Sequence, residues 1–145
     1  MNLQEILIRD NKLVYRTRGV SMEPMLRQNR DLVIIYTCSS RLKKYDVAFY
    51  KRGSNYVLHR VINVLDDGYV IRGDNTYVDE HILDQDILGI LVGFKRKGKY
   101  YEVTNKNYLR YVRFWTAIYP LRRKLYQLKK IIKKILKYCL IHRKG

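Results

Sequence analysis

The spacing of apolar residues changes near residue 105, and this change most strongly limits how the chain can fold. Before it, short apolar runs alternate with turn residues, a pattern typical of β-strands joined by tight turns. After it, apolar residues recur at three- and four-residue steps, as they do on one face of an α-helix. The sequence therefore predicts a mainly β domain at residues 1–104, followed by a helical extension at residues 105–145.

The β-rich part contains seven runs with the length and composition of strands. They lie at residues 13–17, 32–37, 46–51, 56–65, 69–72, 87–95 and 100–104. Asp66-Asp67-Gly68 and Lys97-Gly98-Lys99 separate consecutive runs and predict hairpin turns, so the sheet is expected to be mostly antiparallel. Residues 1–10 fit either a short amphipathic helix or an opening strand.

Charge is distributed unevenly along the chain. The formal net charge is +17, but residues 103–145 hold thirteen of the thirty Lys and Arg residues and none of the thirteen Asp and Glu residues. The helical extension is therefore expected to carry charge of one sign, whereas the β-rich part is nearly balanced.

Three interpretations of the extension remain open. Its apolar stripe runs through Leu121, Leu125, Leu128, Ile132, Ile135 and Cys139, with lysines between these positions. Such a helix can lie in the interface of an anionic membrane, where Trp115 and nearby tyrosines would also fit. Alternatively, the stripe covers the β domain or a protein partner while the lysines face solvent. Binding of nucleic acid through the lysines is the least favoured, because only charge supports it.

The sequence predicts no metal, cofactor or disulfide. Cys38 and Cys139 are far apart and are expected to be free thiols. The N-terminal residues lack the apolar core of a signal peptide, and no run approaches the ~18 apolar residues needed to cross a bilayer. A cytoplasmic or peripheral-membrane location is expected.

A serine between a glycine and a proline, Ser21, is the strongest candidate for a reactive group. Its segment, residues 18–26, lies just before a strongly apolar strand, so the hydroxyl is expected on a rigid turn beside the sheet. Serine needs a base to act as a nucleophile near neutral pH. His59 is the favoured base, because it lies at the centre of the longest predicted strand. His81 lies in a predicted loop, and His142 lies among cations.

Carboxylates follow the strand that is expected to pair with the strand of His59. Asp74, Asp79 and Glu80 all lie within residues 71–80. A carboxylate on the second ring nitrogen would fix the tautomer of His59 and stabilise its protonated form. Gly73-Asp74-Asn75 is also a turn signature, so a catalytic and a structural role for Asp74 are equally supported.

Taken in order, these segments resemble the conserved boxes of the type I signal peptidases. The resemblance is closest to the endoplasmic-reticulum and archaeal branch, which uses a Ser-His pair, and it covers about residues 13–95. The matching segments are Ser-Met-Glu-Pro at 21–24, Asp-Leu-Val at 31–33, Tyr-Asp-Val at 45–47, His-Arg-Val at 59–61, Gly-Asp-Asn at 73–75 and Val-Asp-Glu at 78–80. The resemblance implies a signal-peptidase-like antiparallel β fold and cleavage of extended peptides after small residues.

The resemblance also implies roles for single residues. Ser21 would be the nucleophile and His59 its general base, while Asp74 and Asp79 match acidic positions of the branch. Asp79 is the favoured carboxylate for orienting His59, with Glu80 as the competing choice one residue later.

The remaining assignments concern the surroundings of the nucleophile. The backbone amides of Ser21 and Gly19 are assigned to an oxyanion hole, and Met22 and Pro24 to substrate binding. Gly19-Val20 stands where the branch has Ser-Gly, so no hydroxyl lies two positions before Ser21.

Two functions follow as hypotheses. The leading one is a serine endopeptidase that cleaves an extended peptide, such as a leader or precursor, near a membrane surface or in the cytoplasm. The alternative is a non-catalytic module that keeps the peptidase fold and binds a peptide or a membrane.

Overall fold

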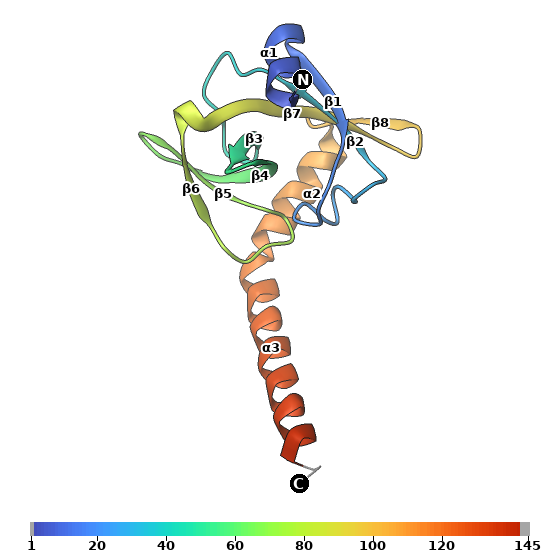
Figure 1. Cartoon of the computed structure of the whole chain (residues 1–145), viewed down its shortest axis with the longest axis vertical. Coiled ribbons are helices and arrows are strands. Elements are labelled where there is room, and N and C mark those ends of the chain that lie inside the picture. Colours follow the sequence, from blue (N-terminus) through green and yellow to red (C-terminus); the bar gives the residue numbers. More distant parts are fainter. Residues whose placement is uncertain (1, 143–145) are drawn as a thin grey trace. The chain divides into compact units, whose positions relative to one another are not determined.

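The computed structural model describes residues 2–142 and consists of two compact units (Figure 1). Within the described residues, the first unit is formed by residues 2–112 and contains all the strands, and the second is formed by residues 113–142. The division falls inside the second helix of the chain, so each unit is described on its own.

The first unit is built on one antiparallel sheet. Its eight strands are β1 (Lys12–Arg16), β2 (Leu32–Tyr36), β3 (Val47–Arg52), β4 (Asn55–Val64), β5 (Gly68–Arg72), β6 (Glu80–Leu83), β7 (Ile87–Arg96) and β8 (Lys99–Glu102). The order across the sheet is β1-β2-β7-β3-β4-β5-β6, and β8 pairs with β7. The prediction of a mainly antiparallel β domain followed by a helical segment is therefore confirmed.

Most predicted local elements are present. The hairpins β4–β5 and β7–β8 form at the predicted turns. The N-terminal segment is a helix, α1 (Leu3–Asp10), whose start is capped in both directions. The side chain of Asn2 accepts a hydrogen bond from the amide of Glu5, and the Glu5 carboxylate accepts one from the amide of Asn2. Strand β6 was missed, since residues 79–81 were expected to form a loop; it is followed by a short 3-10 helix, η1 (Asp84–Asp86).

The register of the central strands decides which residues share a face. His59 lies opposite Ala48 of β3, and Val61, two residues along β4, lies opposite Ile71 of β5. Ile71 in turn lies opposite Glu80 of β6. Because paired residues share a face and successive residues alternate, His59 and Glu80 project from the same face of the sheet.

Each face of the sheet carries its own apolar core. One core surrounds Phe49 and Leu58 and includes Met22, Met25 and Leu26 from the segment of Ser21. The other surrounds Tyr50, Val61 and Ile71 and lies on the face of His59. The serine turn is thus anchored by three buried side chains that follow Ser21 within five residues.

Two helices follow the last strand, α2 (Lys106–Ala117) and α3 (Tyr119–His142). The first two turns of α2 belong to the first unit, and the rest of α2 and all of α3 belong to the second. Among residues 2–142, no helix combines the length and apolar character that crossing a membrane requires.

Candidate active site

Ser21 lies in a compact turn between β1 and β2. Gly19 enters this turn with φ of +83°, a backbone conformation that glycine adopts without steric cost. The turn is closed by two main-chain hydrogen bonds, from Glu23 N to Val20 O at 3.1 Å and from Leu26 N to Met22 O at 2.9 Å. These bonds and the buried methionines hold Ser21 half-buried in a fixed position.

Gly73 brings the serine turn and the strand of His59 together. A Cβ atom on this residue would lie 2.6 Å from the main-chain oxygen of Ser21 and 3.0 Å from Nε2 of His59. The first distance is too short for a carbon atom beside a main-chain oxygen, and the second is very tight, so a residue larger than glycine would push the serine turn away. The main chain of Ser21 and Nε2 of His59 therefore pack around the same point.

Asn75 stabilises the contact between the Gly73 loop and the serine turn with two hydrogen bonds. Its main-chain amide donates to Ser21 O at 2.8 Å, and its side-chain amide donates to Val20 O at 3.2 Å. The Gly73-Asp74-Asn75 segment thus supplies both the space and the hydrogen bonds that hold Ser21 beside His59. Within the described residues, no hydrogen bond joins Ser21 Oγ directly to the imidazole.

His59 is buried, with 3% of its surface exposed, and Nδ1 faces two oxygen atoms. The hydroxyl of Tyr50 and Oε1 of Glu80 each lie 3.2 Å from Nδ1. The Tyr50 hydroxyl donates to Oε2 of Glu80 at 3.3 Å, and Arg52 donates to Oε1 at 2.8 Å. This network favours the tautomer with hydrogen on Nδ1, which leaves the lone pair of Nε2 towards Gly73 and Ser21.

Burial and Glu80 act on His59 in opposite directions. Burial lowers the pKa of His59, the Glu80 carboxylate raises it, and the net pKa lies below the ordinary value of 6.5. His59 is therefore neutral near pH 7, as a general base must be.

The carboxylate beside His59 is Glu80, which corrects the preference for Asp79. Asp79 precedes the first residue of β6, so its side chain points away from the His59 face and accepts two hydrogen bonds from Arg72. Glu80 begins β6 and points to the His59 face. The missed strand β6 explains the error, because without it the two neighbouring acids could not be assigned to opposite faces.

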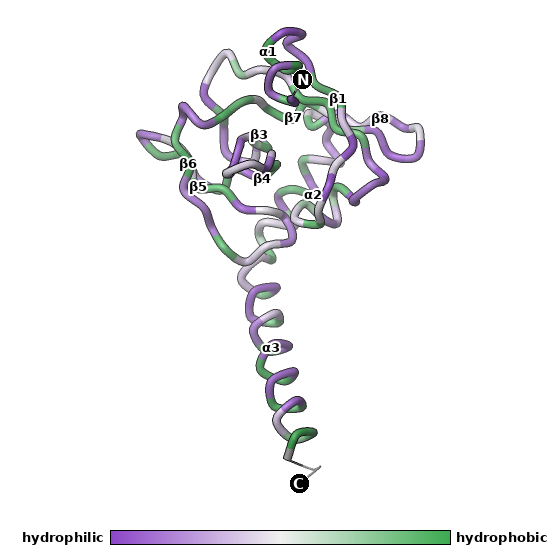
Figure 2. Tube along the Cα trace, viewed as in Figure 1, coloured by the Kyte–Doolittle hydropathy of each residue, from purple (hydrophilic) through white to green (hydrophobic). Residues whose placement is uncertain are grey.

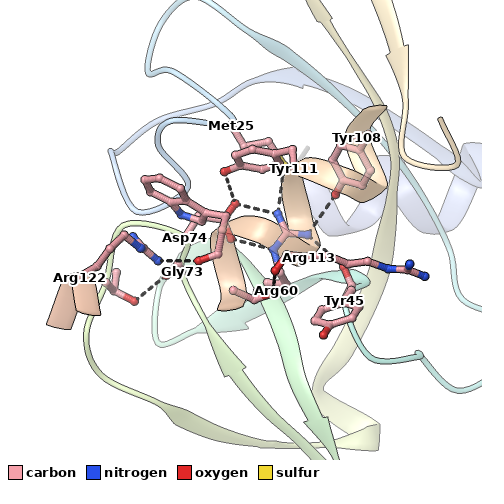
Figure 3. Close-up of polar contacts among 12 residues, drawn as sticks. Met25, Tyr45, Arg60, Gly73, Asp74, Tyr108, Tyr111, Arg113 and Arg122 are labelled. Atoms are coloured by element: carbon pink, nitrogen blue, oxygen red, sulfur yellow. Dashed lines mark hydrogen bonds and ion pairs between the residues drawn. The ribbon is translucent and has the colours of Figure 1, made fainter. Parts of the chain in front are cut away.

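Asp74 holds a buried arginine, so its catalytic assignment is corrected in favour of the structural alternative. Both of its carboxylate oxygens accept hydrogen bonds from Arg60, each at 2.7 Å, and Oδ2 also accepts one from Tyr111 at 3.0 Å (Figure 3). Arg60 is fully buried and donates further to Tyr45 O and to the Tyr108 hydroxyl. This network fixes the loop of Gly73 from the face opposite His59.

Two cavities adjoin the serine turn. One, of about 280 Å³, is lined by Gly19 and Met22 together with residues of β1, β3 and β4. Met22 is a core residue, only 5% exposed, that also lines part of this cavity. Pro24 is exposed and lines a second cavity of about 490 Å³ beside Phe94 and Tyr108. The two residues assigned to substrate binding therefore lie at different cavities.

The amide of Ser21 is available as a donor. Within residues 2–142, no protein acceptor receives a hydrogen bond from the main-chain N–H of Ser21 or of Gly19. An oxyanion hole in a serine peptidase requires unpaired amides of this kind beside the reactive serine.

Sequence reasoning missed Tyr50, Arg52 and Asn75. Tyr50 lies in β3, the strand beside β4, and its position in the strand alternation gave a signal. Only the register between β3 and β4 shows that its side chain shares the face of His59. No group of three or more His, Cys, Asp or Glu residues within the described chain is arranged to hold a metal ion.

Comparison of the sequence with protein-family models and with curated proteins found no match.

Proposed function

We propose that the chain is a serine endopeptidase with a signal-peptidase-like fold, and that it cleaves an extended leader or precursor peptide. The observation that supports this most strongly is the meeting of Ser21 and His59 Nε2 around Gly73, with Glu80 on the opposite ring nitrogen. Such an arrangement matches the chemical needs of a nucleophile, a base and an orienting carboxylate.

In the first half of the reaction, His59 Nε2 takes the proton of Ser21 Oγ as this oxygen bonds to the peptide carbonyl carbon. The resulting imidazolium is stabilised by Glu80 through Nδ1–H. Negative charge develops on the substrate carbonyl oxygen, which accepts hydrogen bonds from the amides of Ser21 and Gly19.

The C–N bond of the tetrahedral intermediate then breaks. His59 returns the proton to the departing amine, leaving an ester between Ser21 and the acyl half of the substrate. Water completes the cycle by the same route, giving its proton to His59 as it attacks the ester, and Ser21 Oγ recovers a proton when it leaves.

A second candidate function is a non-catalytic module that binds peptides. It is favoured by the lack of a direct hydrogen bond between Ser21 Oγ and His59 in the described residues. Catalytic hydrogen bonds are often long in the absence of substrate, so the geometry is compatible with catalysis.

Peptide hydrolysis decides between the two functions. An unbiased peptide library incubated with the full chain should yield products that the Ser21→Ala variant does not form, measured by mass spectrometry. A binding module would instead retain peptides without cleaving them in both proteins.

The position of Glu80 beside Nδ1 of His59 leads to a more specific prediction. Glu80→Gln should lower kcat by about 10²-fold, because the variant no longer stabilises the imidazolium form of His59. Loss of this charge also removes an interaction that raises the pKa of His59, so the acid limb of kcat/KM should move to lower pH.

Asp79→Asn is the matched control, since it removes the neighbouring carboxylate from the opposite face. It should change kcat by less than about 2-fold and leave the pH profile in place. Equal losses in the two variants would contradict the assignment of Glu80.

A further inference from the structure

Helix α3 presents a continuous apolar stripe to solvent. It is formed by Leu121, Leu125, Leu128, Ile132, Ile135 and Cys139, which recur at three- and four-residue steps. The leucines and isoleucines of the stripe are 46–60% exposed. At about 1.5 Å per residue, the helix is about 36 Å long, so this stripe is far larger than the scattered exposed leucines of ordinary surfaces.

The opposite side of α3 is cationic. At about 100° per residue, six basic side chains fall on the half of the helix that faces away from the stripe. They are Arg122, Arg123, Lys130, Lys133, Lys134 and Lys137. No acid occurs anywhere in residues 103–145, so no neighbouring side chain in this segment neutralises them. Figure 2 shows the resulting alternation of hydrophobic and hydrophilic residues along α3.

We propose that α3 lies in the interface of a lipid bilayer that contains anionic lipids. In this position the apolar stripe is buried among acyl chains, while the long lysine side chains extend to the anionic headgroups. The charge of α3 between Arg122 and Lys137 complements such a surface, and the apolar stripe and the cationic side both contact the bilayer. Nucleic acid would satisfy the lysines and leave the apolar stripe in water.

Vesicle co-sedimentation of the full chain tests this proposal. Vesicles of phosphatidylcholine mixed with phosphatidylglycerol should bind at least about 10-fold more tightly than vesicles of phosphatidylcholine alone, and the difference should shrink as salt is raised. The triple variant Leu128→Gln, Ile132→Gln, Ile135→Gln should weaken binding by at least about 10²-fold.

The helix supplies a matched control on its other faces. Ile131→Gln, Leu140→Gln, Ile141→Gln changes the same number of exposed aliphatic residues outside the stripe and should bind within about 3-fold of the unaltered chain. Equal losses in the two triple variants, or equal binding to both kinds of vesicle, would overturn the proposal.

Double-stranded DNA serves as the competing ligand. Tight binding to DNA that survives the stripe substitutions, without binding to anionic vesicles, would also overturn the proposal and assign the lysines to nucleic acid. Vesicle binding requires no peptide hydrolysis, so failure of the proposed peptidase activity would leave this test unaffected.

Discussion

Replacing His59 with glutamine is expected to lower kcat/KM for peptide hydrolysis by about 10⁴-fold. Glutamine has nearly the size of histidine and can still hydrogen-bond to Tyr50 and Glu80, but it cannot accept the proton of Ser21. Initial rates on a peptide cleaved by the wild-type chain measure the loss. A variant that retained more than about a tenth of the activity would show that His59 is not the base.

The pH dependence gives an independent check on the same residue. The pKa of buried His59 lies below 6.5, so the acid limb of wild-type kcat/KM should lie below pH 6.5. As pH falls, His59 is protonated in the unfolded chain before it is protonated in the folded chain, because its pKa is lower in the folded state. The stability that neutral His59 contributes is therefore present above pH 6.5 and is lost as pH falls through the folded-state pKa. His59→Gln should therefore flatten the fall in stability across that range.

The largest effect on stability is expected at Arg60. Arg60→Met leaves the carboxylate of Asp74 buried without its bidentate partner, and breaking such a pair typically lowers the free energy of unfolding by about 3–5 kcal/mol. Urea unfolding followed by near-ultraviolet circular dichroism measures this change.

Two comparisons separate the lost ion pair from lost packing. The double variant Arg60→Met, Asp74→Asn removes both charges and should recover part of the loss, because no buried charge is then left unpaired. Arg9→Met, which breaks the exposed pair with Asp10, should leave the unfolding midpoint nearly unchanged. If the double variant were less stable than Arg60→Met, the unpaired carboxylate could not be the cause.

Local patterns were enough to predict most of the fold. The length and composition of residues 56–65 identified β4 with His59 at its centre, and Asp66-Asp67-Gly68 identified the hairpin to β5. These signals depend only on neighbours in the sequence. Strand β6 has four residues and directly follows the loop of Gly73, so it lacks the length at which alternation becomes recognisable.

The candidate site was predictable only in part for the same reason. Ser21 and His59 stand out because a serine in a rigid turn and a histidine in a central strand are local features. The choice between Asp79 and Glu80 depends on the register between β5 and β6, which is a property of paired strands. The buried ion pair between Arg60 and Asp74 connects residues fourteen positions apart, and tyrosines of α2 hydrogen-bond to it. No pattern among neighbouring residues in the sequence predicts such a contact.

The most direct test of the proposed mechanism compares Ser21→Ala with Ser40→Ala. Ser40 is an exposed serine outside the candidate site, so its substitution controls for general effects of removing a hydroxyl. On any peptide that the wild-type chain cleaves, Ser21→Ala should lose at least about 10⁴-fold in initial rate while Ser40→Ala retains the wild-type rate. Cleavage by Ser21→Ala at the wild-type rate would contradict the assignment of Ser21 as the nucleophile.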